Sequence, residues 1–124
     1  IEKALIYSKG FENEVSFYNA NDQMNFNACQ ILLQTIGEES KKLNTDLKQE
    51  FPSIPWDNIA NLRNRIAHDY RGTDPNIVFD VIQNFLQPLK ESLVKMISKI
   101  DYDKLKLLTA LESENYKHID YLNQ

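Results

Sequence analysis

The spacing of glycine and proline constrains the fold of this chain most strongly. The 124 residues contain three glycines and four prolines, whereas a sandwich or barrel of short strands needs turn residues about every 8–12 positions. Between these residues the apolar positions recur at intervals of three and four, which is the period of an amphipathic helix. The sequence therefore predicts an all-α fold, and its length indicates a single domain.

Four main helices are predicted, and short connections join them into an up-down four-helix bundle. The first covers residues 1 to about 9 and ends at Gly10. Because its opening residues are already amphipathic, we expect this helix to begin before residue 1. After a short polar loop, the second helix runs from about residue 19 to about residue 47. Gly37 lies inside it at a cost of about 1 kcal/mol relative to alanine, so we expect a close approach of another helix there.

Prolines mark the third and fourth helices. Pro55 suits the first turn of a helix that runs to residue 69 or 70. Asp74-Pro75 is a second start signal, because a capping side chain is followed by proline. Pro88 is expected to kink the fourth helix near residues 84 to 88.

A weaker apolar pattern continues beyond the fourth helix. It predicts a short fifth helix from about Asp101 to Leu111. We therefore divide the chain into a helical domain over residues 1–111 and a polar C-terminal tail over residues 112–124.

Charge and cysteine content exclude several classes of function. Fourteen Lys and Arg against 18 Asp and Glu give a formal charge of -4, so any contact with nucleic acid must be local. The single cysteine, Cys29, excludes an intramolecular disulfide and reads as a small buried hydrophobe. With only two histidines beside it, we expect no zinc site and no cofactor. No stretch approaches the ~20 apolar residues of a membrane span, and we expect a cytoplasmic location.

The densest polar cluster beside a histidine lies on the third helix, over residues 62–70. At 100° per residue, three of its residues are predicted to face the core, namely Leu62, Ile66 and Tyr70. Arg63 falls on the shoulder of that apolar stripe, whereas Asn64 and His68 lie one turn apart on the opposite side. About 140° separates Arg63 from His68 on an ideal helix, so one regular helix does not direct both at one small target.

Two arrangements can bring Arg63 and His68 together. Either the helix loosens before Gly72, or a second copy of the chain lays its own third helix alongside and closes a shared cleft. We favour the second arrangement, a homodimer, because closed two-fold symmetry is the commonest oligomeric solution.

Over about residues 24–95 the sequence closely resembles the HepT-like branch of the HEPN superfamily. The signature of that superfamily is an arginine, four to six residues and a histidine. A polar residue commonly follows the arginine, and in this branch a tyrosine stands two places after the histidine. The matching residues are Arg63, Asn64, His68 and Tyr70. Further matches surround them, namely Ile36-Gly37-Glu38, Lys41-Lys42-Leu43, Phe51-Pro52, Ile54-Pro55-Trp56, Ile59-Ala60, Gly72 and Asp74.

The resemblance implies a dimeric, metal-independent ribonuclease toxin encoded beside a minimal nucleotidyltransferase antitoxin. Its implied catalytic residues are Arg63, Asn64 and His68, and the antitoxin can silence such toxins by transferring AMP to the tyrosine, here Tyr70. The implied substrate is RNA, with tRNA as one candidate. Arg65 and Arg71 are candidates for RNA binding. Histidine suits proton transfer near neutral pH, and arginine offers a planar charged fork to phosphate oxygens.

Other readings of the same residues remain open. Arg63 and His68 can belong to an ordinary solvated helix face on which the arginine pairs with an acid such as Asp69 or Asp74. Tyr70 can serve in packing. The chain as a whole can be a noncatalytic helical module that docks a partner nucleotidyltransferase and serves as its substrate, or a nucleotide-binding bundle. The Glu38-Glu39 and Lys41-Lys42 pairs read as an exposed face laced with salt bridges.

Overall fold

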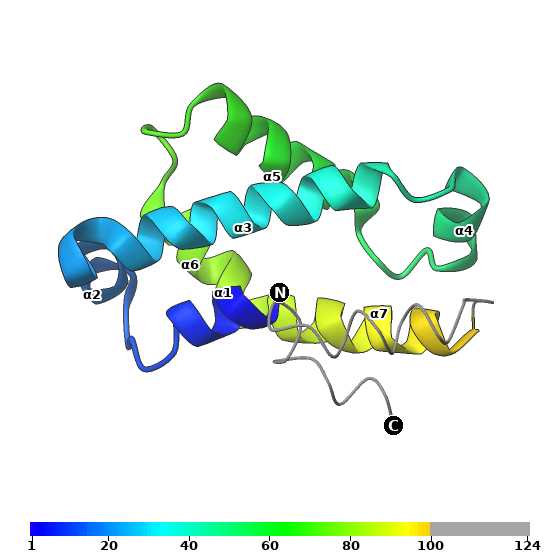
Figure 1. The fold of residues 1–124 in the computed structure, drawn as a ribbon, viewed down its shortest axis with the longest axis horizontal. Helices are drawn as coiled ribbons and strands as arrows, with labels where there is room; N and C mark the ends of the chain where they lie inside the picture. Colours follow the sequence, from blue (N-terminus) through cyan, green and yellow to red (C-terminus); the bar gives the residue numbers. More distant parts are fainter. Residues whose placement is uncertain (100–124) are drawn as a thin grey trace, which may run out of the picture.

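The computed structural model describes residues 1–99, and these residues form helices and loops without any strand (Figure 1). The expected all-α helical bundle is thereby confirmed. The helices are α1 (Glu2–Tyr7), α2 (Glu14–Asn19), the short 3-10 helix η1 (Ala20–Gln23), α3 (Met24–Lys41), α4 (Thr45–Glu50), α5 (Trp56–His68), α6 (Pro75–Asn84) and α7 (Leu86–Lys99).

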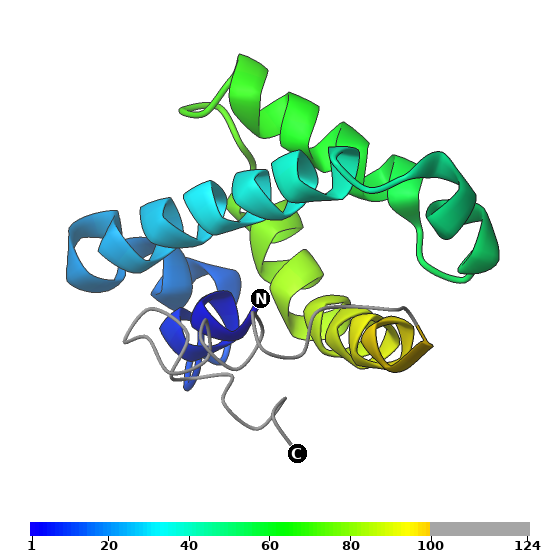
Figure 2. The same ribbon diagram turned by 45° about the vertical axis from the view of Figure 1, so that its right-hand side comes forward.

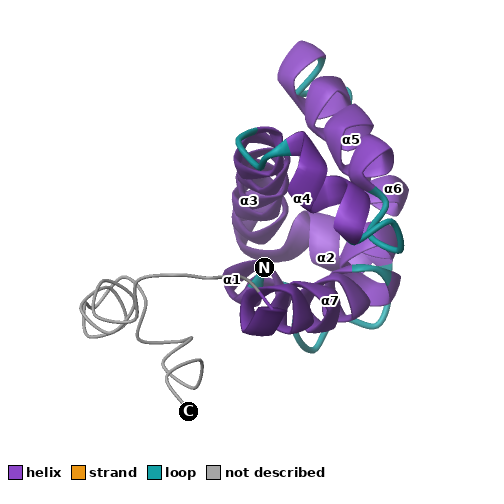
Figure 3. Cartoon of the chain, turned by 90° about the vertical axis from the view of Figure 1, so that its right-hand side faces the viewer, coloured by secondary structure: helices purple, strands orange, loops and turns teal. Residues whose placement is uncertain are grey.

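Helix α3 runs through the middle of the bundle. In Figure 1 it crosses the view between α5 on one side and α1 with α7 on the other. Figure 3, turned by 90°, shows α3 beside α5 and above α1. The pairing of α3 with α5 is the most extensive contact between helices of the described region, and an ion pair between Glu2 and Lys90 joins α1 to α7. The core is built from apolar side chains of nearly every helix, including Ala4, Phe17, Phe26, Leu33, Ile66, Ile82 and Leu86.

The expected helix from residue 19 to residue 47 is interrupted at both ends, so that prediction is wrong in its bounds. Before α3, the residues Asn21, Asp22 and Gln23 have φ angles of 52°, 56° and 65°, a left-handed conformation that no right-handed helix contains. The segment expected to be a polar loop holds α2, whose first turn is capped because the Ser16 amide donates to Asn13 Oδ1 at 2.9 Å.

After α3, a second cap divides the chain again. Helix α3 ends at Lys41, and the Asp46 amide donates to Asn44 Oδ1 at 2.7 Å to begin α4. Leu43 and Leu47 continue the apolar period across this break. They lie in separate segments, but both pack against the core. Periodicity alone therefore predicts one helix here, whereas the asparagine cap divides it into two.

Gly37 lies where α5 packs closely against α3, as the sequence predicted. A β-carbon built on Gly37 would lie 2.8 Å from Arg63 Cγ and 3.3 Å from the backbone oxygen of Ile59. Both neighbours belong to α5, so the absence of a side chain at Gly37 lets the two helices approach each other.

The start of α6 follows the predicted signals. Asp74 Oδ1 accepts a hydrogen bond from the Asn76 amide at 2.9 Å, and Pro75 occupies the first turn. The expected kink is a complete break at Phe85, where α6 ends and α7 takes a new direction (Figure 2). Pro88 falls in the first turn of α7, where its missing amide removes no intrahelical hydrogen bond.

The predicted fifth helix over residues 101–111 and the tail over residues 112–124 lie outside the described residues. Among the helices of residues 1–99, none has the length and apolar character required to cross a membrane.

Candidate active site at the C-terminal end of α5

Arg63 is held between α5 and α3. Its Nε donates to Glu38 Oε1 of α3, and its Nη1 donates to Asn64 Oδ1 at 3.0 Å. The arginine side chain is 26% exposed, so it is mostly covered by protein. Arg63 does pair with an acid, but that acid comes from α3 and is neither Asp69 nor Asp74.

His68 is the last residue of α5 and is exposed. It lines an open hollow of about 630 Å³ between the end of α5 and the loop that leads to α6. Asn64 lies on the same hollow, one helical turn before His68, together with the carboxylate-bearing residues Asp69 and Asp74. The structure thus places Asn64 and His68 side by side in one hollow that is open to a ligand.

Arg63 is not among the residues that line this hollow. The separation of Arg63 from His68 expected from the helical angle therefore holds in the folded chain. Asn64 connects the two, because its side chain accepts from Arg63 and also lines the hollow of His68.

Tyr70 does not face the core, so this prediction is wrong. Helix α5 ends at His68, and the chain turns at Asp69, whose φ and ψ are -144° and 70°. Tyr70 is 37% exposed and its hydroxyl points to the Asn27 carbonyl of α3 at 3.4 Å. The angular extrapolation failed because it continued the helix two residues beyond its end.

A compact turn presents Tyr70. The Gly72 amide donates to Asp69 Oδ1 at 3.0 Å, and the Thr73 hydroxyl donates to the Asp69 carbonyl at 3.0 Å. A β-carbon on Gly72 would lie 2.6 Å from Asp69 Cγ, so only glycine allows the carboxylate to fold over this turn. The turn places Tyr70 and Arg71 next to each other at its exposed edge.

The local charge around His68 is mixed. Arg65 is exposed and lines the same hollow, and Arg71 is exposed in the adjoining turn. The carboxylates of Asp69 and Asp74 offset these two positive charges. Within residues 1–99, the two arginines therefore do not by themselves create a positive surface.

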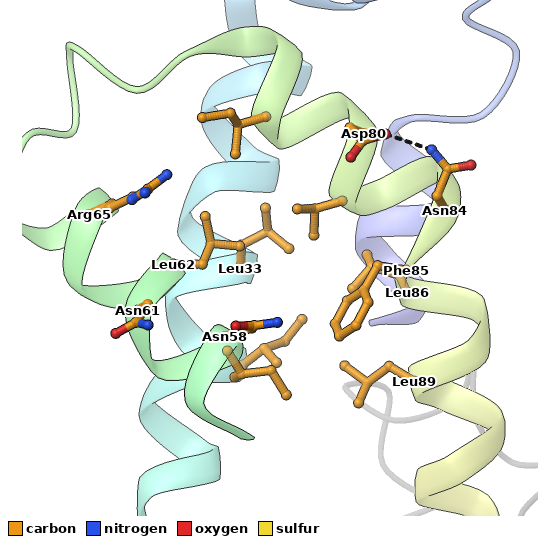
Figure 4. A pocket seen from close by; sticks show the side chains of 14 residues that line it. Leu33, Asn58, Asn61, Leu62, Arg65, Asp80, Asn84, Phe85, Leu86 and Leu89 are labelled. Atoms are coloured by element: carbon orange, nitrogen blue, oxygen red, sulfur yellow. Dashed lines mark hydrogen bonds between the residues drawn. The ribbon is translucent and has the colours of Figure 1, made fainter. Parts of the chain in front are cut away.

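A second, apolar hollow of about 450 Å³ adjoins the first along α5 (Figure 4). Leu62 enters it from α5, Leu33 from α3, and Phe85 and Leu89 from the opposite wall. The two hollows share part of their walls, namely Asn61, Leu62, Arg65 and Ile77. A continuous groove thus runs beside the face of α5 that carries Asn64 and His68.

Glu38 is the site residue that the sequence reasoning missed. It was assigned with Glu39 to an exposed face of salt bridges, and the 2.9 Å pair of Glu39 with Lys42 fits that reading. Glu38 instead contacts Arg63, 25 positions away in the sequence. Its place beside Gly37 in the matched Ile36-Gly37-Glu38 run was the available signal.

Cys29 lies outside the residues that line this site. Cys29 is fully buried in α3, and burial raises the pKa of its thiol to about 12, so it is protonated and shielded at neutral pH. Within residues 1–99, no three His, Cys, Asp or Glu side chains gather closely enough to hold a metal ion.

Comparison with known proteins finds one matching family and several relatives. The family model described as ribonuclease HepT-like matches residues 1–96. A Thermococcus cleftensis protein named "Probable ribonuclease HepT" is 33% identical over 64 residues, which cover 52% of this chain and 58% of that protein. The Methanocaldococcus jannaschii protein "Putative RNase MJ1380" is 31% identical over 61 residues, covering 49% of this chain and 56% of its own.

A further Methanocaldococcus jannaschii protein, "Putative RNase MJ0127", is 32% identical over 75 residues, or 60% of this chain and 62% of that protein. The chain therefore spans less than two thirds of the length of these relatives. No solved structure matches it.

Proposed function

This chain belongs to the ribonuclease HepT-like family, and from that premise we propose that it is a metal-independent endoribonuclease, the toxin of a toxin–antitoxin pair. One observation carries the proposal. Asn64 and His68 line the same open hollow, and Arg63 donates a hydrogen bond to Asn64. These are the residue types that RNA cleavage without a metal requires, at the spacing of the family signature.

The cleavage step follows from these groups. The ribose 2′-oxygen loses its proton to a base and attacks the adjacent phosphorus, while the 5′-oxygen leaves and takes a proton from an acid. The products are a 2′,3′-cyclic phosphate and a 5′-hydroxyl. An imidazole at His68 supplies proton transfer, which contributes on the order of 10²- to 10⁴-fold in rate. The Arg63 guanidinium stabilises the charge that develops on the phosphate oxygens.

The complete site is proposed to form in a homodimer. In one chain, Arg63 stands outside the hollow of His68, and an apolar groove adjoins the same face of α5. Two-fold pairing of this face would cover the apolar side chains and bring the His68 and Arg63 groups of both chains to a common cleft. That cleft would supply acid, base and phosphate clamp together.

Cleavage is expected to resist metal chelation. The purified protein should cut single-stranded RNA equally well with and without EDTA, because proton transfer and charge stabilisation come from side chains. An RNA of the same sequence with 2′-O-methyl groups should remain intact, since it lacks the attacking hydroxyl. Gel analysis of the product ends checks both points. Loss of cleavage in EDTA with recovery in Mg²⁺ would show that a metal performs the chemistry.

We further propose that a partner nucleotidyltransferase silences the toxin at Tyr70. The Tyr70 oxygen would attack the α-phosphorus of ATP and release pyrophosphate, leaving AMP on the phenol. The exposed position of Tyr70, two residues beyond His68, supports this proposal. A bound AMP adds bulk and negative charge where an RNA phosphate has to lie.

Tyr70→Phe is expected to stay active and to escape silencing. With the partner nucleotidyltransferase and ATP, the parent protein should gain AMP and lose RNA cleavage, whereas the variant should do neither. Mass spectrometry and a cleavage assay measure the two effects. Tyr7→Phe is the matched control, because Tyr7 is 38% exposed against 37% for Tyr70. If Tyr7→Phe blocks modification and Tyr70→Phe does not, the acceptor is misassigned.

The mixed charge of the site favours one alternative. The carboxylates of Asp69 and Asp74 line the hollow of His68, and the whole chain is acidic. This suits a noncatalytic module that docks a nucleotidyltransferase and serves as its substrate. Tight binding to that partner by a dimer that cuts no RNA would favour this alternative.

A further inference from the structure

The contact between Glu38 and Arg63 is unexplained by the chemistry above. Glu38 belongs to α3 and Arg63 to α5, and the contact joins the carboxylate Oε1 to the guanidinium Nε. The two side chains are 40% and 26% exposed, so the pair is partly shielded from water. A charge pair in such a place restrains its arginine more strongly than a fully solvated pair does.

The stem of Arg63 is restrained as well. It lies directly over Gly37, where a β-carbon would come within 2.8 Å of Arg63 Cγ. Gly37 therefore provides the space in which the stem lies, and Glu38, the next residue, holds the end of the side chain. Two consecutive residues of α3 thus determine where an α5 side chain lies.

The restraint leaves donors for a substrate. A guanidinium has five N–H groups in a fixed plane. Glu38 takes the Nε donor and Asn64 takes one donor of Nη1, so other donors of the same plane can reach two oxygens of one phosphate. Asn64 also lines the hollow of His68, so the guanidinium is hydrogen-bonded to a residue of that hollow.

We propose that Glu38 is a positioning residue that holds the Arg63 guanidinium in the orientation needed to grip the scissile phosphate. This inference rests on the proposed ribonuclease activity. Glu38 touches no reacting atom; it acts through Arg63. Its loss leaves the positive charge in place but lets the plane rotate, which lowers the rate of the chemical step more than the affinity for RNA.

Steady-state cleavage by three variants tests the role. Glu38→Ala should lower kcat by about 10- to 100-fold, the scale of a misplaced catalytic group. The KM should change by less than about three-fold, because the Arg63 charge remains and only one negative charge is lost. Glu38→Gln keeps an acceptor oxygen for Arg63 Nε and should restore kcat to within about three-fold of the parent. Glu39→Ala removes the same charge from the neighbouring residue, which pairs with Lys42, and should cleave as the parent does.

A spectroscopic readout is independent of cleavage. The chain has three arginines, so a ¹H–¹⁵N spectrum of the Nε groups contains three side-chain signals, and Arg63→Lys identifies the one from Arg63. That signal should exchange slowly with water in the parent, Glu38→Gln and Glu39→Ala proteins and rapidly in Glu38→Ala. Retention of slow exchange in Glu38→Ala would overturn the proposed restraint.

The outcomes separate the two proposals. If the parent does not cleave RNA, the proposed function fails and the positioning role falls with it. If the parent cleaves and Glu38→Ala cleaves equally well or faster, only the positioning role is overturned, and a faster variant would show that Glu38 competes with the phosphate. A loss in Glu38→Ala that Glu38→Gln does not restore would also overturn it.

Discussion

His68→Ala is expected to lower the rate of RNA cleavage by about 10²- to 10⁴-fold, the usual contribution of a general acid or base. The free energy of unfolding should hardly change. His68 is the exposed last residue of α5, and within residues 1–99 its imidazole makes no hydrogen bond or ion pair. Surface substitutions of this kind usually alter the free energy of unfolding by less than about 0.5 kcal/mol. Single-turnover cleavage and thermal melting of the same samples measure the two quantities.

The control for His68→Ala is a neighbouring exposed residue of the same helix. Ala67 precedes His68 and is exposed, so Ala67→Ser changes the surface of α5 without touching an ionisable group. It should cleave RNA and stop cell growth as the parent does, whereas His68→Ala should be harmless to cells. Light scattering checks that all three proteins have the same oligomeric state. Equal cleavage by His68→Ala and the parent would remove His68 from the reaction.

The elements that sequence reasoning located correctly are those whose signals are local. Pro55 stands just before α5, and Asp74 with Pro75 begins α6, because capping and a fixed φ act within a few residues. The end of α3 was missed because Leu43 and Leu47 extend the apolar period across the Asn44 cap. Periodicity reports which residues reach the core, and residues of two successive helices can share one core.

The same distinction between local and tertiary signals separates the correct from the wrong predictions about the site. The angle between Arg63 and His68 depends only on helix geometry, so the sequence predicted their separation. The partner of Arg63 depends on how α5 lies on α3, and Glu38 is 25 residues away. Tyr70 lies past the helix end, where a side-chain hydrogen bond from the Gly72 amide to Asp69 sets the course of the chain. Such tertiary and turn contacts have no period that a single sequence displays.

Gly37→Ala is expected to destabilise the protein although alanine is the better helix former. The new β-carbon would lie 2.8 Å from Arg63 Cγ and 3.3 Å from the Ile59 backbone oxygen. The Ile59 backbone oxygen cannot move without the rest of α5, so α3 and α5 have to move apart. Their pairing is the most extensive helix contact of the described region. Overpacking of this kind costs about 1–3 kcal/mol, whereas the gain in helix propensity is about 1 kcal/mol. The net loss is up to about 2 kcal/mol, which for a domain of this size corresponds to a fall in Tm of up to roughly 12 °C.

The same substitution should reduce activity beyond what the lost stability explains. Moving the Arg63 stem off Gly37 also pulls its guanidinium away from Glu38, so cleavage measured well below the Tm should fall as in Glu38→Ala. Thr35→Ala is the matched control, because Thr35 is exposed on α3 and its replacement raises helix propensity without a clash. It should melt at or slightly above the parent temperature and cleave normally. A Gly37→Ala protein that melts at the same temperature as Thr35→Ala would show that a β-carbon fits between the two helices. Contact with Gly37 would then not explain the position of the Arg63 side chain.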